Sequence, residues 1–113
     1  MSEVDKRRAA GQLVILIVDE QQVLIDLLVE QLISEQVRVI GATSAHQGKE
    51  HFEANNPDVL ILDADLPDAF DLLQAVRSAD TVCAILAITG SDEVRSRLDA
   101  LPVLTAKWTS LGR

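Results

Sequence analysis

Aromatic side chains are almost missing from this sequence, which has one Trp, two Phe and no Tyr among its 113 residues. Surfaces that bind single-stranded nucleic acid stack bases on aromatic rings, so the sequence lacks the groups that such a surface needs. With 48% hydrophobic residues and so few rings, the core must consist of Leu, Ile, Val and Ala. A chain of this length forms one domain and buries enough apolar surface to fold without disulfides.

Basic residues are also scarce. The sequence has 10 Lys and Arg against 18 Asp and Glu, so its formal net charge is −8. A chain this acidic repels nucleic-acid phosphates, and we expect this segment not to bind DNA or RNA directly. The expected partners are cations, basic protein surfaces and groups that are delivered together with a metal.

Cysteine and long hydrophobic runs are nearly absent. The single cysteine, Cys83, cannot form an internal disulfide and lies in an apolar run, as expected of a buried thiol in a cytoplasmic protein. The longest early apolar run, Leu13–Val18, is too short for a signal peptide or a membrane span. We therefore expect a cytoplasmic protein without a membrane segment.

Apolar residues instead form short continuous runs that alternate with helical stripes. Continuous β-prone runs are typical of strands that are buried on both faces of a parallel sheet. The expected strands are Leu13–Val18, Val37–Gly41, Val59–Leu62, Val82–Ile88 and Pro102–Ala106. The expected helices are Gln21–Glu35, Ala45–Ala54, one opened by Asp71, and one from Ser91 or Asp92 to Leu98. Residues 1–12 lack apolar periodicity and are expected to form a flexible leader before a domain at residues 13–113.

This alternation predicts right-handed βαβ units, a parallel sheet and helices on both faces. Two strand orders are common for such a chain, and both place ligands at the carboxyl ends of the strands. In the flavodoxin-like order the first and third strands are neighbours. Asp19 and Glu20, after the first strand, would then meet Asp63, after the third. Three carboxylates in one place raise one another's pKa unless another group neutralises them.

The residue types at the strand ends are those of a phosphoryl-accepting site. Mg²⁺ binds one or two carboxylates together with waters and phosphate oxygens. Asp63 is a candidate nucleophile. Lys107 offers a positive charge to offset phosphoryl charge, and Thr89 offers a hydroxyl donor.

These segments resemble the receiver domain of response regulators in two-component signalling. The resemblance covers Leu13 to Lys107, and four segments carry it: Val18-Asp19-Glu20, Leu60-Ile61-Leu62-Asp63-Ala64-Asp65-Leu66-Pro67, Ala87-Ile88-Thr89-Gly90 and Lys107. It implies an α/β fold with a doubly wound, five-stranded parallel sheet in the order 2-1-3-4-5 and helices on both faces.

The resemblance also implies a role for each strand-end residue. Asp63 would accept a phosphoryl group from a histidine kinase or phosphotransfer protein, and would bind Mg²⁺ together with Asp19 and Glu20. Asp65 would ligate the metal through its backbone carbonyl, and its side chain would affect the lifetime of the phosphate. Thr89 would be the switch hydroxyl and Lys107 the phosphate-contacting lysine. Such a domain is a switch rather than a metabolic enzyme, and a C-terminal output domain can follow it.

The sequence departs from the family pattern at several positions. Glu20 stands where Asp is usual, Asp71 where glycine is common, Leu104 where an aromatic is usual, and Trp108 where proline follows the lysine. Because the chain stops at Arg113, we expect the family's last helix to be absent. An apolar face would then be exposed, which favours a homodimer or a domain swap.

Alternative readings stay open at this point. Asp63 also fits a turn-capping acid, Glu20 a first-turn acid, Thr89 a simple β-former and Lys107 a surface lysine. The competing hypothesis for the whole chain is a degenerate, receiver-like interaction module that acts without phosphorylation. A flavin or nucleotide binder is disfavoured, because the sequence contains no Gly-rich phosphate-binding motif.

Overall fold

A computed structural model describes residues 2–79, 82–101 and 108–112. For residues 108–112 it describes the backbone only. The elements are α1 (Glu3–Ala9), β1 (Leu13–Val18), α2 (Gln22–Leu32), β2 (Val37–Ala42), α3 (Ala45–Asn55), β3 (Val59–Asp63), α4 (Ala69–Ala79), β4 (Ala84–Thr89), α5 (Asp92–Asp99) and β5 (Trp108–Gly112).

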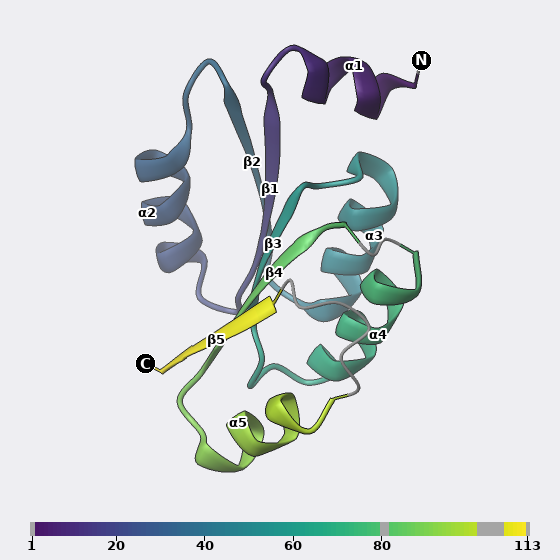
Figure 1. Cartoon of the computed structure of the whole chain (residues 1–113). Helices are drawn as coiled ribbons and strands as arrows, with labels where there is room; N and C mark the ends of the chain where they lie inside the picture. Colours follow the sequence, from purple (N-terminus) through teal and green to yellow (C-terminus); the bar gives the residue numbers. More distant parts are fainter. Residues whose placement is uncertain (1, 80–81, 102–107, 113) are drawn as a thin grey trace.

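The strands form one parallel sheet in the order β2-β1-β3-β4-β5, which confirms the predicted strand order (Figure 1). Each neighbouring pair is parallel, as βαβ connections require. The strand next to β4 is Trp108–Gly112. The sequence predicted the fifth strand at residues 102–106, and these lie outside the described residues.

Alternate residues of the central strands build the main core. Leu16, Leu60 and Ile85 face the same side of the sheet and join a single buried cluster. Phe52 of α3, Val76 of α4 and Leu98 of α5 belong to the same cluster. These three helices therefore cover one face of the sheet, and α2 lies on the other (Figure 1). Helices on both faces are thus confirmed.

The face on the side of α2 is less completely buried. The residues of β3 and β4 that alternate with the core residues point to this face and remain partly exposed. They are Val59, Ile61, Leu86 and Ile88. On this face α2 contacts β2, the strand at the edge of the sheet. The helix therefore covers β3 and β4 less completely than the three helices of the other face do.

Gly41 lets α2 approach β2 closely. A Cβ added to Gly41 would lie 2.4 Å from Cγ2 of Ile25, which is the buried residue of α2. No real Cβ tolerates such a distance, so either the helix or the Ile25 side chain would have to move.

We expect Gly41→Ala to lower the free energy of unfolding by about 1–3 kcal/mol, the usual effect of overpacking. Urea denaturation measures it. In an Ile25→Ala background the same substitution should be much less destabilising, because the clashing methyl group is gone. An equal loss in both backgrounds would contradict this explanation.

Within residues 1–12, which the sequence predicted to be a flexible leader, Glu3–Ala9 forms the helix α1. The Ser2 side chain accepts a hydrogen bond from the Asp5 N–H at 3.1 Å and caps the helix. No residue of α1 is buried, so apolar periodicity could not reveal it. The signal that could have found it was the capping Ser2 with acids in the first turn and bases in the last.

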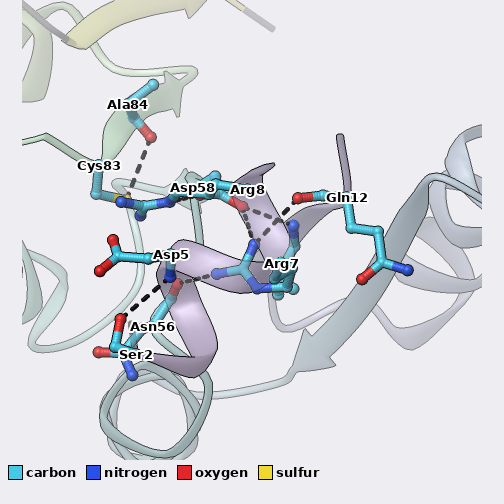
Figure 2. Close-up of polar contacts among 10 residues, drawn as sticks. Ser2, Asp5, Arg7, Arg8, Gln12, Asn56, Asp58, Cys83 and Ala84 are labelled. Atoms are coloured by element: carbon cyan, nitrogen blue, oxygen red, sulfur yellow. Dashed lines mark hydrogen bonds and ion pairs between the residues drawn. The ribbon is translucent and has the colours of Figure 1, made fainter. Parts of the chain in front are cut away.

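Ion pairs hold α1 against the amino-terminal end of the sheet (Figure 2). Arg7 and Arg8 both pair with Asp58, which lies between α3 and β3. The same carboxylate accepts a hydrogen bond from the Val14 N–H at 2.9 Å, and Arg7 also donates to the Asn56 carbonyl at 2.9 Å. Asp58 therefore joins α1, β1 and the start of β3.

The environment of Asp58 makes this contact sensitive to pH. Burial raises the pKa of Asp58, but hydrogen bonds from the Val14 N–H and from the guanidinium groups of Arg7 and Arg8 outweigh it. The pKa of Asp58 is therefore below its ordinary value. A carboxylate with a depressed pKa contributes stability above its unfolded-state pKa and loses that contribution as the pH falls through its folded-state pKa.

We expect Asp58→Asn to lower the free energy of unfolding at neutral pH by about 1–3 kcal/mol, because charge-assisted hydrogen bonds are lost. The difference from the wild type should shrink below about pH 4, where the carboxylate becomes protonated. Urea titrations at several pH values measure it, with Glu3→Gln on the exposed face of α1 as the control. A difference that persists unchanged in acid would contradict the role of the charge.

Candidate functional site

Two buried carboxylates lie next to each other at the carboxyl end of the sheet. Val18 pairs with Leu62, so Asp19 and Asp63 are the next residues on neighbouring strands. Their exposed fractions are 3% and 4%. Asp19 Oδ1 accepts a hydrogen bond from the Gln21 N–H at 2.9 Å, and Asp63 Oδ1 accepts one from the Asp65 N–H at 3.0 Å. Each carboxylate is thus oriented by the backbone of its own loop.

Thr89 completes this edge of the sheet from β4. Asp63 pairs with Ile88, so Thr89 lies one residue beyond that pair. Thr89 is fully buried, with an exposed fraction of 0%. Its Oγ1 accepts a hydrogen bond from the Ser91 N–H at 3.0 Å, which fixes the hydroxyl at the start of α5.

The Asp65 carboxylate bridges the ends of β3 and β4. Thr89 Oγ1 donates to Asp65 Oδ1 at 2.5 Å, and the Gly90 N–H donates to Asp65 Oδ2 at 2.9 Å. Sequence reasoning assigned the metal contact of Asp65 to its carbonyl and did not foresee this bridge. Strand register alone cannot show it, because the contact depends on the path of the loop after β3.

The other predicted site residues are placed differently. Glu20 follows Asp19 directly, but its side chain is exposed. Lys107 and Leu104 lie outside the described residues. Asp71 does not open its helix as predicted. The helix begins at Ala69, and Asp71 occupies its first turn, where the helix dipole favours an acid.

A second contact that the sequence did not reveal joins α4 to α5. The Arg97 guanidinium lies 4.0 Å from the centre of the Phe70 ring. Arg97 is an exposed residue despite this contact. Phe70 in α4 and Arg97 in α5 thus connect two helices that flank the loop carrying Asp65.

The donor set suits a cation that needs few protein ligands. Among the described residues there is no group of three or more His, Cys, Asp or Glu that could hold a metal ion. Mg²⁺ does not need such a group, since it keeps several waters and uses one or two carboxylates. The adjacent pair Asp19 and Asp63 fits that requirement.

Comparison with known proteins identifies the family. Residues 15–106 match the sequence profile described as response regulator receiver domain. This chain belongs to that family. The receiver domain is 33% identical over 98 residues to Probable transcriptional regulatory protein TcrX of Mycobacterium tuberculosis, covering 84% of this chain and 42% of that protein. It is also 33% identical over 89 residues to transcriptional regulatory protein TrcR of the same species, covering 77% of this chain and 35% of that protein.

Solved structures show the same fold. Response regulator TrrA from Thermotoga maritima, crystallised with Mg²⁺-BeF, has a TM-score of 0.72 at 23% identity, covering 90% of this chain and 87% of that one. The non-phosphorylated HemR receiver domain from Leptospira biflexa has a TM-score of 0.71 at 25% identity, covering 88% of this chain and 82% of that one. The predicted family and fold are therefore confirmed.

This receiver domain spans less than half the length of its two curated relatives. Receiver domains of response regulators are signalling domains rather than metabolic enzymes, in agreement with the sequence prediction. No helix in the described part of the chain is both long and apolar enough to cross a membrane.

Proposed function

We propose that this receiver domain is a phosphoryl-accepting switch, in which Asp63 takes a phosphoryl group from a histidine kinase in the presence of Mg²⁺. The observation that supports this most is the pair of buried, oriented carboxylates, Asp19 and Asp63, beside the buried hydroxyl of Thr89. Two adjacent carboxylates that converge at the carboxyl edge of a parallel sheet, each oriented by a backbone N–H, are the donor type that Mg²⁺ binds, so the arrangement supports a phosphoryl-accepting function.

The acceptor step needs an oriented carboxylate nucleophile. An Asp63 oxygen would attack the phosphorus of a phosphohistidine or of a small acyl phosphate, forming an acyl-phosphate P–O bond. The bond from phosphorus to the leaving group breaks, and the leaving group keeps the electron pair. The Asp65 N–H holds Asp63 Oδ1 at 3.0 Å and so sets the plane of the carboxylate for this attack.

We propose that Asp19, Asp63 and the backbone carbonyl of Asp65 would hold Mg²⁺, with Glu20 at the solvent side. The ion, when bound, would offset the negative charge of the carboxylates and of the phosphoryl oxygens. The family resemblance also assigns Lys107 as the cationic partner of the phosphoryl group, and we keep that role as a proposal. The register of β5 argues against it, because Trp108, the next residue, pairs with Ile85 at the start of β4, whereas Gly112 pairs with Thr89. Water would later attack the phosphorus and regenerate the Asp63 carboxylate.

Phosphorylation would change the site by adding charge and oxygen acceptors. The phosphoryl group carries about −1.5 to −2 charge and three acceptor oxygens. Thr89 offers a buried hydroxyl on β4, and this hydroxyl is connected to α5 through Ser91. Drawing Thr89 toward the phosphoryl group would shift an existing equilibrium between two positions of the β4–α5 segment.

The alternative is a receiver-like interaction module that acts without phosphorylation. Asp71, Leu104 and Trp108 motivate it, because each replaces a residue type that is usual in the family. The contact between Thr89 and Asp65 also shows the switch hydroxyl already engaged by a protein carboxylate.

Intact-mass spectrometry after incubation with Mg²⁺ and acetyl phosphate separates the two functions. We expect the wild type to gain the mass of one phosphoryl group, and Asp63→Asn to gain none because the nucleophile is gone. Chelation of Mg²⁺ should abolish the gain. Asp68→Asn removes a charge from the exposed loop beyond the site and is the matched control.

Circular dichroism of Asp63→Asn shows whether the variant remains folded. Absence of phosphorylation in a folded wild type would overturn the switch and favour the interaction module. Phosphorylation of Asp63→Asn would instead contradict the choice of acceptor.

We propose a cytoplasmic regulator that controls an output domain, since its curated relatives are transcriptional regulatory proteins. Transcriptional control would then act through that output domain. The net charge of −8 disfavours direct contact between the receiver domain and DNA.

We also propose that the partly exposed apolar face of β3 and β4 pairs with a second copy of the chain, because exposed apolar patches favour association and a contact between identical patches closes a two-fold dimer. Leu86→Gln should then shift sedimentation from dimer toward monomer. Val82→Gln, at an exposed position before β4, should leave the sedimentation unchanged. A wild type that sediments as a monomer at high concentration would refute the dimer.

A further inference from the structure

We propose that the Asp65 carboxylate is an internal competitor of the phosphoryl group. It holds the Thr89 hydroxyl and the Gly90 N–H in the unphosphorylated domain, and a phosphoryl group on Asp63 has to displace it. This inference rests on the proposed acceptor function of Asp63. It assigns Asp65 the role of a positioning residue that sets how readily the switch turns on.

The geometry resembles the binding of an oxyanion. A hydroxyl and a backbone N–H from adjacent residues at the end of β4 converge on one anionic group, each donating to a different oxygen. Preorganised donor pairs of this kind stabilise oxygen anions, and hydrogen bonds to a charged acceptor are stronger than neutral ones. Any anion placed between the ends of β3 and β4 could use the same two donors. In this structure that anion is supplied by the protein itself.

The chemistry of a hydroxyl makes the competition exclusive. Thr89 Oγ1 carries a single proton and can donate only one full hydrogen bond. It donates to Asp65 Oδ1 at 2.5 Å, whereas a second acceptor, the Ser91 carbonyl, lies at 3.4 Å. A phosphoryl oxygen can therefore receive the Thr89 proton only after the Asp65 carboxylate has lost it.

Asp65 also contacts the acceptor side of the site. Its N–H donates to Asp63 Oδ1 at 3.0 Å, while its carboxylate holds Thr89 and Gly90. The same residue thus connects the phosphoryl acceptor to the switch hydroxyl. Phosphorylation would place a second anion beside the carboxylate, and like charges at close range repel. Asp65 is an exposed residue, so its side chain can turn into solvent when displaced.

Calorimetric titration with beryllofluoride and Mg²⁺ tests the competition. We expect Asp65→Asn to bind this phosphoryl analogue about 10-fold more tightly than the wild type, because the competing anion is gone. Asp68→Asn removes the same charge from the same loop without touching Thr89 or Gly90. It should therefore stay within about twofold of the wild type. Asn is also compatible with the positive φ of 62° at position 68.

The increase in beryllofluoride affinity caused by Asp65→Asn must also depend on Thr89. In a Thr89→Ala background, Asp65→Asn should raise the beryllofluoride affinity much less, because the Thr89 hydroxyl proton for which the two anions compete is absent. Equal gains from Asp65→Asn and Asp68→Asn would overturn the inference, since general charge repulsion would then explain both. An unchanged affinity in Asp65→Asn would overturn it as well.

Hydrogen exchange of the Gly90 amide tests the contact without any phosphoryl analogue. We expect this amide to exchange several-fold faster in Asp65→Asn than in the wild type or in Asp68→Asn, because it loses a charged acceptor. Unchanged exchange would overturn the bridge itself. If no variant binds beryllofluoride while Gly90 exchange responds as expected, the acceptor function fails and the competition fails with it, whereas the bridge is upheld.

Discussion

The register of three parallel strands determines where the chemistry can occur. Val18 lies beside Leu62, and Asp63 lies beside Ile88, so the ends of β1, β3 and β4 meet at one edge. Val18, Leu62 and Ala87, close to these ends, are fully buried, which prevents any strand from slipping without exposing core side chains. That packing fixes the positions of the three polar residues at the strand ends, Asp19, Asp63 and Thr89. The backbone N–H groups of the following loops then orient the two carboxylates.

Much of this arrangement follows from the sequence because it depends on local rules. Continuous apolar runs identify buried parallel strands, and the alternation with helices fixes the connections. The residues immediately after the first, third and fourth runs are then forced to the same edge of the sheet. Asp19, Asp63 and Thr89 could therefore be grouped correctly, although Asp63 and Thr89 prove to be the last residues of their strands rather than the first beyond them.

Other features could not be predicted from the sequence, because they are not stabilised by periodically spaced apolar residues. Helix α1 buries no side chain and depends on ion pairs between Arg7, Arg8 and a residue far along the chain, Asp58. The bridge from Asp65 to Thr89 and Gly90 depends on a loop conformation with a positive φ at Asp68 nearby. The contact of Arg97 with Phe70 needs the relative placement of two helices. Sequence spacing constrains none of these three.

The location of α1 has a practical consequence. This helix lies at the end of the sheet where the strands begin, while Asp19, Asp63 and Thr89 lie where they finish (Figure 1). A fluorophore or a surface-immobilisation tag attached to α1 would consequently lie at the end of the molecule opposite Asp19 and Asp63. The protein can thus be tethered for single-molecule recording with the edge that carries them facing freely into the surrounding solution.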